Sequence, residues 1–454
     1  MEGRQDPFYY IPSIVELEKK IRQISSLRLR DFILAMSSGA TPSVKEEEKF
    51  YSDEVNGVPF IRVQNLSPTN ELMLNDLRYI NHETHRKYLN RSQVKGGDLL
   101  VKITGVGRMA VSSVVPEGFE GNTNQHLVVI KTKDFKTSEV LATFLNTDIG
   151  EKLASRRATG GTRPALDYSA LKSIPIVFKP EIIETIKKAV AAKRAKEAQA
   201  QSLLDGIDAY LLERLGIETP AATEKKKTFF VRSSIIFGNR FDAPAYRQSF
   251  NYDSSKFPIE KLSKIAFINP RVTFEKLDSE SEISFVPMEV INERDGAIEE
   301  LRSKKVRETT GFTRFQENDL IWAKITPCMQ NGKSAVARNL KQGFACGSTE
   351  FYVIRPRTKD VSVDYLHFLL RNKRVLENAQ NFFGGSAGQQ RVSVDFLKNF
   401  RVPVPPIEIQ DEIAAHIQSL RERARELERE ARAEVERARA EVEQMILGEA
   451  SVDA

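Results

Sequence analysis

The chain contains few of the residues from which metal sites and nucleophilic catalytic sites are most often built. Its 454 residues include two cysteines, one tryptophan and five histidines. Cys328 and Cys346 form no Cys-x-x-Cys pair, which argues against a structural zinc site and favours a reducing compartment. We therefore expect a cytoplasmic protein that binds no metal.

Long apolar runs are also missing. None approaches the roughly 18 residues that a membrane-spanning helix needs, and the polar N-terminus has no signal-peptide core. Hydrophobic residues make up 41% of the chain and charged residues 29%, which is typical of a globular protein of two or three domains at this length. The net charge of +6 is compatible with nucleic-acid binding but does not require it.

Familiar catalytic motifs are absent as well. Asn331-Gly332-Lys333-Ser334 resembles the end of a phosphate-binding loop, but Pro327 stands where the first glycine belongs and has no N–H to offer a phosphate. We expect a hairpin turn there. His82 and His85 are three residues apart, whereas a metalloprotease helix places its histidines four apart, so we expect a surface loop. These absences favour a binding protein over an enzyme.

What the chain does contain is an internal repeat. The segment Asp98 to Thr104 returns, with one residue inserted, as Asp319 to Thr326, and Asn124 to Ile130 aligns with Ser348 to Ile354. A Gly-Gly loop follows in each copy, at Gly160-Gly161 and at Gly384-Gly385, and each copy then enters a long charged helix. A repeat of this length predicts two homologous domains, each followed by a helix.

Hydrophobic periodicity and turn residues set the expected boundaries. Short strand-like runs in each copy predict a mixed α/β (α+β) fold, with helices at 14–24, 138–155 and 363–382. We expect an N-terminal helical segment at 1–26, a first domain at 27–178, a central helix at 179–217, a linker at 218–229, a second domain at 230–405, a C-terminal helix at 406–448 and a tail at 449–454.

The two long helices each carry an apolar stripe at coiled-coil spacing. The expected contact positions are Ile186, Val190, Leu204 and Leu211 in the first helix and Ile413, Ile417, Leu420, Leu427, Val435 and Val442 in the second. Arg and Glu alternate on the flanks of the second helix, as on a solvated surface. Because a stripe this long needs an equally long partner, we expect the two helices to pack against each other.

The loops around the glycine pairs are the strongest candidates for a ligand-binding surface. The first loop carries Arg156, Arg157 and Arg163, and the second carries Gln389, Gln390 and Arg391. Arg and Gln side chains match the hydrogen-bonding edges of guanine and adenine, and glycine allows a close approach to a nucleic-acid backbone. Lys102 and Lys324 are further candidates, as repeat-matched contacts to phosphates, with a salt bridge inside the sheet as the equal alternative.

The chain resembles the DNA specificity (S) subunits of type I restriction-modification systems. The resemblance lies in Ser38-Gly39-Ala40-Thr41-Pro42, in Gly57 to Val63, in the two Asp-Leu strands, and in Val402-Pro403-Val404-Pro405-Pro406 followed by Gln410. The family usually has Glu-Gln after its Pro-Pro, whereas here Ile409 precedes Gln410. The order of domain, helix, domain and helix covers nearly the whole chain.

This resemblance implies a non-catalytic subunit with two tandem target recognition domains, each reading one half of a bipartite, asymmetric double-stranded DNA site. The two helices would form an antiparallel coiled coil that sets the spacing, and their length of about 50 Å exceeds the roughly 35 Å of one DNA turn. Two modification subunits and restriction subunits would be partners, and S-adenosylmethionine, ATP and magnesium would bind in those subunits rather than here. The alternatives are a stand-alone DNA-modifying enzyme with an unrecognised active site and a coiled-coil scaffold that binds protein.

Overall fold

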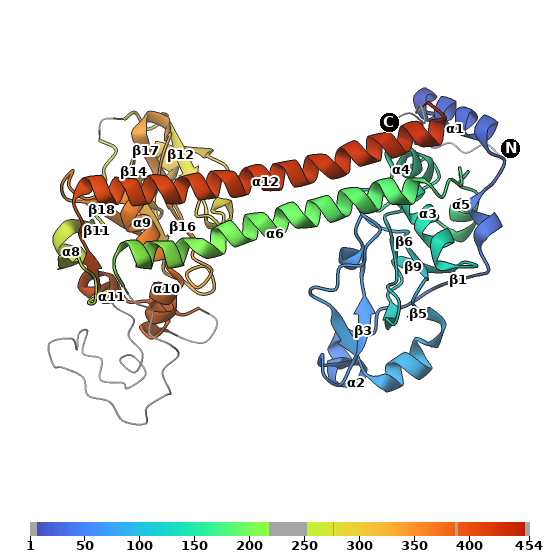
Figure 1. The fold of residues 1–454 in the computed structure, drawn as a ribbon, viewed down its shortest axis with the longest axis horizontal. Helices are drawn as coiled ribbons and strands as arrows, with labels where there is room; N and C mark the ends of the chain where they lie inside the picture. Colours follow the sequence, from blue (N-terminus) through green and yellow to red (C-terminus); the bar gives the residue numbers. More distant parts are fainter. Residues whose placement is uncertain (1–6, 218–251, 276, 386–388, 450–454) are drawn as a thin grey trace. The chain divides into compact units, whose positions relative to one another are not determined.

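The computed structural model describes residues 7–217, 252–275, 277–385 and 389–449 (Figure 1). The chain forms two compact units. Unit 1 comprises Met1–Glu197 and Glu428–Ala454, and unit 2 comprises Ala198–Leu427. The expected linker at 218–229 and the start of the expected second domain lie outside the described residues. In the described part of the chain, every helix is too short or too polar to cross a membrane.

Unit 1 contains two sheets. The first has the order β1-β9-β6-β7 and is antiparallel, and the second has the order β2-β4-β3-β8-β5 with β3 and β8 parallel. The strands are β1 (Ala35–Ser38), β2 (Tyr51–Ser52), β3 (Val58–Ile61), β4 (Arg78–Ile80), β5 (Gln93–Lys95), β6 (Leu99–Lys102), β7 (Ser112–Val114), β8 (Glu120–Thr123) and β9 (Leu127–Lys131).

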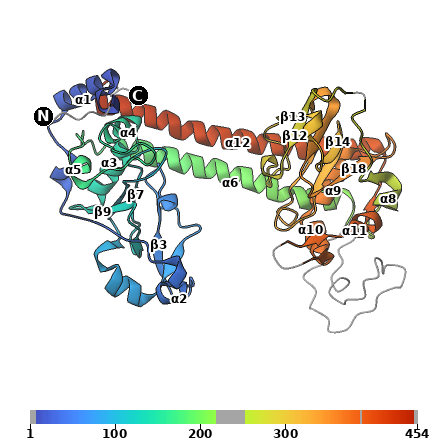
Figure 2. The ribbon, with the colours of Figure 1, turned by 180° about the vertical axis from the view of Figure 1, so that it is seen from behind.

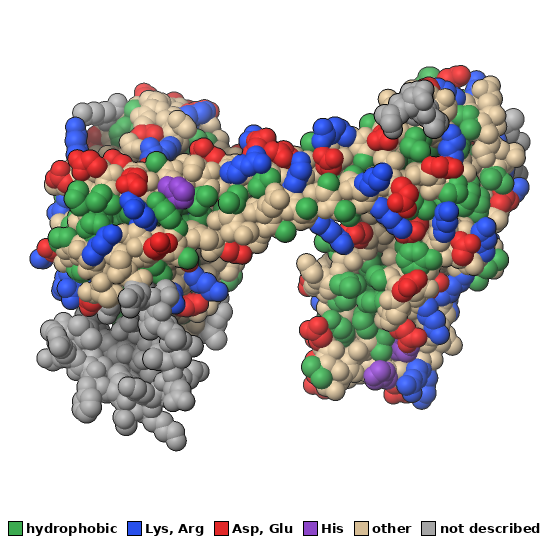
Figure 3. Space-filling model, in the orientation of Figure 1, with side chains coloured by type: hydrophobic (Ala, Val, Ile, Leu, Met, Phe, Trp, Pro, Cys, Tyr) green, Lys and Arg blue, Asp and Glu red, His purple; other side chains and the backbone are tan. Residues whose placement is uncertain are grey.

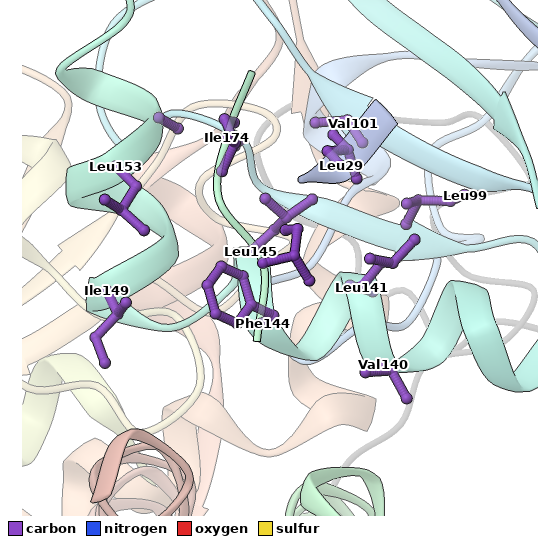
Figure 4. Close-up of a cluster of buried hydrophobic side chains, with 14 of the residues drawn as sticks. Leu29, Leu99, Val101, Val140, Leu141, Phe144, Leu145, Ile149, Leu153 and Ile174 are labelled. Carbon is purple, nitrogen blue, oxygen red and sulfur yellow. The ribbon is translucent and has the colours of Figure 1, made fainter. Parts of the chain in front are cut away.

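Helices cover the first sheet of unit 1 and complete its core. They are α1 (Pro12–Ile24), α3 (Phe135–Leu145), α4 (Asp148–Ser155) and α5 (Tyr168–Lys172), whereas the short helix α2 (Glu47–Phe50) lies beside β2 of the second sheet. The unit also contains the short turns η1 (Pro7–Tyr10), η2 (Leu29–Phe32), η3 (Val44–Glu46), η4 (Val63–Asn65), η5 (Thr84–Tyr88) and η6 (Asn90–Ser92). Figure 4 shows Leu141 and Leu145 of α3 beside Leu99 and Val101 of β6, all fully buried.

Unit 2 repeats this arrangement. Its two larger sheets have the orders β11-β18-β15-β16 and β13-β12-β17-β14, with β12 and β17 parallel, and their strands match those of unit 1 except that β2 has no equivalent. Two further pairs, β10-β21 and β19-β20, form small two-stranded sheets. The strands are β10 (Ile259–Lys261), β11 (Ala266–Ile268), β12 (Glu282–Val286), β13 (Arg302–Lys305), β14 (Thr313–Gln316), β15 (Leu320–Ala323), β16 (Ser334–Val336), β17 (Phe344–Gly347), β18 (Phe351–Pro356), β19 (Phe383–Gly384), β20 (Arg391–Val392) and β21 (Arg401–Pro403).

The helices of unit 2 also follow the order found in unit 1. They are α8 (Leu262–Ile265), α9 (Val363–Arg371), α10 (Lys373–Gln380) and α11 (Val394–Asn399), with turns η8 (Met288–Val290), η9 (Val306–Glu308) and η10 (Lys341–Gly343). The strand register agrees, since Leu99 lies opposite Ile130 and Leu320 opposite Ile354. The repeat predicted from the sequence is therefore a repeat of the fold.

Two predicted helices are each divided in the structure. The segment 138–155 forms α3 and α4, because Thr147 caps α4 by accepting a hydrogen bond from the Gly150 backbone at 3.0 Å. A Cβ at Gly150 would lie 2.3 Å from the Phe144 carbonyl oxygen, so α4 packs tightly on the end of α3. The segment 363–382 likewise forms α9 and α10, with Asn372 capping α10. The prediction of single helices was wrong because capping residues start a new helix there.

The two long helices are α6 (Ile182–Arg214) and α12 (Ile407–Leu447), and each contributes to both units. They end where the sequence predicts, before Gly216 and Gly448, whose positive φ angles of 69° and 73° suit glycine. Within each unit the two helices lie side by side (Figures 1 and 2).

The pairing of α6 and α12 is antiparallel within each unit. In unit 1, Lys179 donates to the Met445 carbonyl and Lys196 contacts Glu430 at 2.9 Å. In unit 2, the ring of Tyr210 lies 4.2 Å from that of His416, and Arg214 pairs with Glu412. Eight of the predicted contact residues are buried, and Leu204 and Leu420 are half-buried.

Helix α1 is attached to the core of unit 1 by a buried ion-pair network. Glu18, 4% exposed, accepts hydrogen bonds from Arg157 at 2.7 Å and 3.0 Å and also from Arg156. Burial alone would raise the pKa of Glu18, but the bonds and charges of Arg157 and Arg156 outweigh it and lower the pKa to about 2. Lys20 of the same helix pairs with Glu449, just after α12.

We expect Glu18→Gln to lower the free energy of unfolding by about 3–5 kcal/mol near neutral pH, because it leaves the buried cations without their carboxylate. Since the folded pKa lies below the unfolded value, the stabilisation is present above the unfolded pKa and is lost as pH falls toward about 2. Denaturant titration at several pH values measures this difference. Glu16→Gln is the matched control, because Glu16 lies on the same helix with its side chain 77% exposed. Equal stabilities of the Glu18→Gln and Glu16→Gln variants at pH 7 would contradict the assignment.

Candidate nucleic-acid interface

The two glycine-pair loops are the tips of equivalent hairpins. In unit 1, Thr159 pairs with Ala165, and in unit 2, β19 pairs with β20. The second arm of each hairpin also pairs with the segment that follows the central strand, Ala165 with Thr104 and Arg391 with Ile325. The hairpins are thus attached to the first sheet of each unit at the same place.

Two backbone hydrogen bonds attach each hairpin to the segment after the central strand, and these bonds match between the two units. Gly105 and Leu166 of unit 1 donate to Pro164 and Ile103, at 3.1 Å and 2.8 Å. In unit 2, Thr326 donates to Gln390 and Val392 donates to Lys324, both at 2.9 Å. This correspondence makes Ala165 equivalent to Arg391 and Pro164 equivalent to Gln390.

One residue earlier, Arg163 in unit 1 and Gln389 in unit 2 occupy the equivalent tip position, and both side chains are exposed. Gly160 has a φ of +99°, which favours glycine and allows the chain to turn at this tip. Gln390 is half-buried, and its backbone N–H donates to the Thr326 hydroxyl at 3.2 Å. Of the predicted base-contacting residues, Arg163 and Gln389 are therefore the most accessible.

Arg391 is held at the base of the second hairpin. It donates to both carboxylate oxygens of Glu350, at 2.9 Å and 2.8 Å, and to the Gln389 carbonyl at 3.0 Å. The Arg391 hydrogen bonds lower the pKa of Glu350. Because the side chain is 42% exposed and these bonds do not use all its donors, Arg391 remains accessible to a ligand. No sequence pattern pointed to Glu350, because its contact with Arg391 depends on the fold bringing distant residues together.

Arg156 and Arg157 lie before the first hairpin, but the structure uses them differently from the prediction. Arg157 is 6% exposed, and both guanidinium groups bind Glu18. Arg156 also donates to the Tyr9 carbonyl at 2.8 Å, with its guanidinium 4.3 Å from the Tyr9 ring centre. Because these contacts hold α1 in place, we leave both residues out of the candidate interface.

Lys102 and Lys324 do not occupy equivalent positions. Lys102 lies opposite Leu127, and in unit 2 the residue opposite the matching Phe351 is Ala323. The inserted residue therefore places Lys324 one position further along, on the other face of the strand. Lys102 is 6% exposed and donates to the carbonyls of Val106 and Arg108, at 2.7 Å and 3.0 Å, so the predicted salt bridge is absent as well.

Lys324 is half-buried, with its ammonium group 5.4 Å from the Tyr352 ring centre. The Tyr352 hydroxyl donates to the Val392 carbonyl at 2.8 Å, in the second arm of the hairpin. Lys324 therefore lies near the second hairpin, whereas Lys102 supports a turn inside unit 1.

Charges of both signs are mixed on the face of the molecule that Figure 3 shows. On the face that Figure 3 shows, Lys and Arg side chains alternate with Asp and Glu side chains rather than forming a patch of one sign. The basic segment at 302–307 follows this pattern, since Arg302 pairs with Glu289 and Glu300, and Lys305 and Arg307 pair with Glu280. The candidate interface is therefore defined by the hairpin tips and not by a broad basic surface.

The described residues contain no cluster of His, Cys, Asp and Glu that could hold a metal ion. The segment Asn331 to Ser334 belongs to the turn that joins β15 and β16, as predicted. His85 lies in the helical turn η5 rather than in a loop, and its ring contacts the side-chain oxygen of Asn122.

Comparison with known proteins gives a family for part of the chain. Residues 251–437 match the family model of the type I restriction modification DNA specificity domain. Two relatives from Escherichia coli are the specificity subunits of the type I restriction enzymes EcoEI and EcoAI, 35% and 33% identical over 186 residues. Each match covers 41% of this chain and 31% of the relative, so the matched part spans about a third of the length of these proteins.

Solved structures with low sequence identity also match over most of the chain. One comes from work on complex assembly and conformational transition of the type I R-M system, with 15% identity, 93% of this chain and 96% of that chain covered, and a TM-score of 0.47. Another is the HsdS subunit from Thermoanaerobacter tengcongensis, with 14% identity, 93% and 95% covered, and a TM-score of 0.37.

We expect Lys102→Met to destabilise unit 1 by about 1–3 kcal/mol, because two turn carbonyls lose their buried donor. Affinity for DNA of any sequence should stay within about twofold, since Lys102 offers no charge at the surface. Thermal unfolding and a low-salt duplex titration measure the two effects. Lys95→Met is the control, because Lys95 is exposed on β5, the strand that precedes β6 in the chain. A uniform loss of duplex affinity without a loss of stability would restore Lys102 as a phosphate contact.

Proposed function

We propose, from the type I restriction modification DNA specificity domain that the chain carries at residues 251–437, that the whole protein is the DNA specificity subunit of a type I restriction-modification complex. Its activity is recognition rather than catalysis. Each unit reads one half of a bipartite, asymmetric site in double-stranded DNA.

This proposal is supported by two hairpins that occupy equivalent positions but carry different residues at their tips. Both units contain the same four-stranded sheet and a matching second sheet, and equivalent backbone bonds attach each hairpin to the first sheet. At the tip, however, one hairpin presents Arg163 and the other Gln389. Arg pairs with guanine and Gln with adenine in the major groove, so two equivalent frames with different tips suit two half-sites of different sequence.

The long helices α6 and α12 have a separate role in this proposal. Their pairing sets the spacing of the half-sites, and their remaining surfaces recruit two modification subunits, which restriction subunits then join. S-adenosylmethionine, ATP and magnesium bind in those partners, so methyl transfer, DNA translocation and cleavage take place outside this chain.

The experiment that tests the function begins with the modification subunit encoded beside this chain. The two proteins are purified together, incubated with genomic DNA and S-adenosylmethionine, and the methylated positions are sequenced. We expect methyladenine at a split, asymmetric motif. Methylation without such a motif, or catalysis by this chain alone, would contradict the proposal.

The target found in this way allows each half-site to be tested separately. We expect Arg163→Ala to weaken discrimination at one half-site only, and Gln389→Ala at the other, each by about 5-fold to 150-fold, since a paired base contact contributes about 1–3 kcal/mol. Competition titrations with duplexes mismatched in one half or the other measure the effect. Each variant is the control for the other, and a change in both half-sites by either substitution would contradict the assignment.

A further inference from the structure

Unit 2 contains a cavity of about 670 Å³ between α9, α12 and the segment 295–301. Its polar lining includes Arg338, Arg421 and Arg425 together with Asp295 and Asp364. It is separate from the hairpin that carries Gln389, none of whose described residues lines it.

Arg421 of α12 is the unusual residue of this cavity. It is 6% exposed, and its guanidinium lies 4.4 Å from the centre of the Phe368 ring. Its buried Nε has no hydrogen-bond partner in the described part of the chain, and no carboxylate there pairs with the side chain. A buried arginine without a carboxylate is costly, because its charge has lost water without gaining an anion.

Three aspartates line the cavity, Asp295, Asp364 and Asp411, and none of them forms an ion pair with Arg421 in the described part of the chain. Asp295 pairs with Arg425 at 2.5 Å, and Asp364 pairs with Arg338. Burial, and then the positive charge of Arg371, lower the pKa of Arg421 to about 9. Burial and the charges of Arg421 and Arg371 also lower the pKa of His367, which lines the cavity. Arg421 is thus a buried cation in the cavity wall without an ion-pair partner in the described part of the chain.

Unit 1 has the equivalent cavity, of about 470 Å³, between α3, α6 and the segment 69–74. Its charges are matched within the chain, since Lys187 pairs with Glu139 at 2.8 Å and Arg194 with Glu71 at 2.6 Å. A cation without a carboxylate partner is therefore specific to the unit 2 cavity and does not follow from the repeated fold.

We propose that the cavity of unit 2 receives the carboxylate of an Asp or Glu side chain from a modification subunit, which pairs with Arg421. The inference rests on the proposed function, in which α12 helps to recruit that subunit. A side chain fits a cavity of a few hundred cubic ångströms, whereas a DNA duplex is too wide to bring its phosphates to a residue that is 6% exposed. The carboxylates of Asp295, Asp364 and Asp411 in the lining also disfavour a phosphate, which carries more negative charge.

Replacing Arg421 with methionine separates binding from folding. We expect Arg421→Met to weaken the affinity of the full chain for the purified modification subunit by about tenfold to a hundredfold, because a charge-assisted pair is lost.

The melting temperature of the Arg421→Met variant should stay equal or rise, since an unpaired buried charge is replaced by an apolar side chain of similar length. Arg421→Lys should keep most of the affinity. Arg423→Met is the control, because Arg423 is exposed on the same helix. Calorimetric titration and thermal unfolding measure both quantities.

The outcomes distinguish this inference from the function on which it rests. Failure of the unsubstituted chain to bind the modification subunit would count against the proposed function. Tight binding by the unsubstituted chain and equal binding by Arg421→Met would overturn the cavity assignment alone. A fall in melting temperature for Arg421→Met would make Arg421 a structural residue and would also overturn it. Loss of duplex affinity with unchanged assembly would identify a phosphate as the occupant and would overturn it as well.

Discussion

Each unit completes its hydrophobic core with side chains from both long helices. In unit 1, Ile186 of α6 and Val442 of α12 belong to the same buried cluster as the α3 and β6 side chains. In unit 2, Leu211 of α6 and Ile413 of α12 pack with α9 and β15 in the same way. Since a buried Ile or Leu contributes about 1.5–3 kcal/mol, neither sheet layer is expected to be stable without the helix pair. The helices are therefore part of the cores of both units, so their pairing cannot be lost without exposing apolar surface in each.

The sequence predicted much of this organisation because the information lay in local patterns. Apolar runs at strand spacing identified β6, β9, β15 and β18, and a three-four spacing identified α6 and α12 together with their glycine ends. The breaks at Thr147 and Asn372 were missed because one capping residue inside an apolar periodic segment hardly changes the pattern. The pairing of Lys102 with Lys324 failed for a different reason. An insertion of one residue reverses the face of a strand, and only the cross-strand register reveals where it falls.

The sites were less predictable than the fold, because they depend on contacts between residues distant in the sequence. The glycine pairs identified both hairpins, and the structure leaves Arg163 and Gln389 exposed at equivalent tips. The Arg156 and Arg157 side chains looked the same as Arg163 in the sequence, yet Glu18 binds both and removes them from the surface. Arg421 illustrates the opposite case, since it lies in a helix rich in Arg and Glu, where pairing with a neighbour is the natural expectation.

In the proposed function, one fold reads two different half-sites because the backbone positions each hairpin and the side chains at its tip contact the bases. The hairpins are attached through main-chain hydrogen bonds at Gly105, Leu166, Thr326 and Val392, which do not depend on the residues at the tips. A change of Arg to Gln at the tip therefore alters the groups offered to DNA without altering the frame that positions them. The two cavities differ in the same manner, since Lys187 and Arg194 are paired with carboxylates in the unit 1 cavity, whereas, among the described residues, Arg421 in the unit 2 cavity is not. The repeat thus provides two similar backbones. Their exposed and cavity-lining side chains differ, while the strand register and the packing of the two long helices keep each backbone the same.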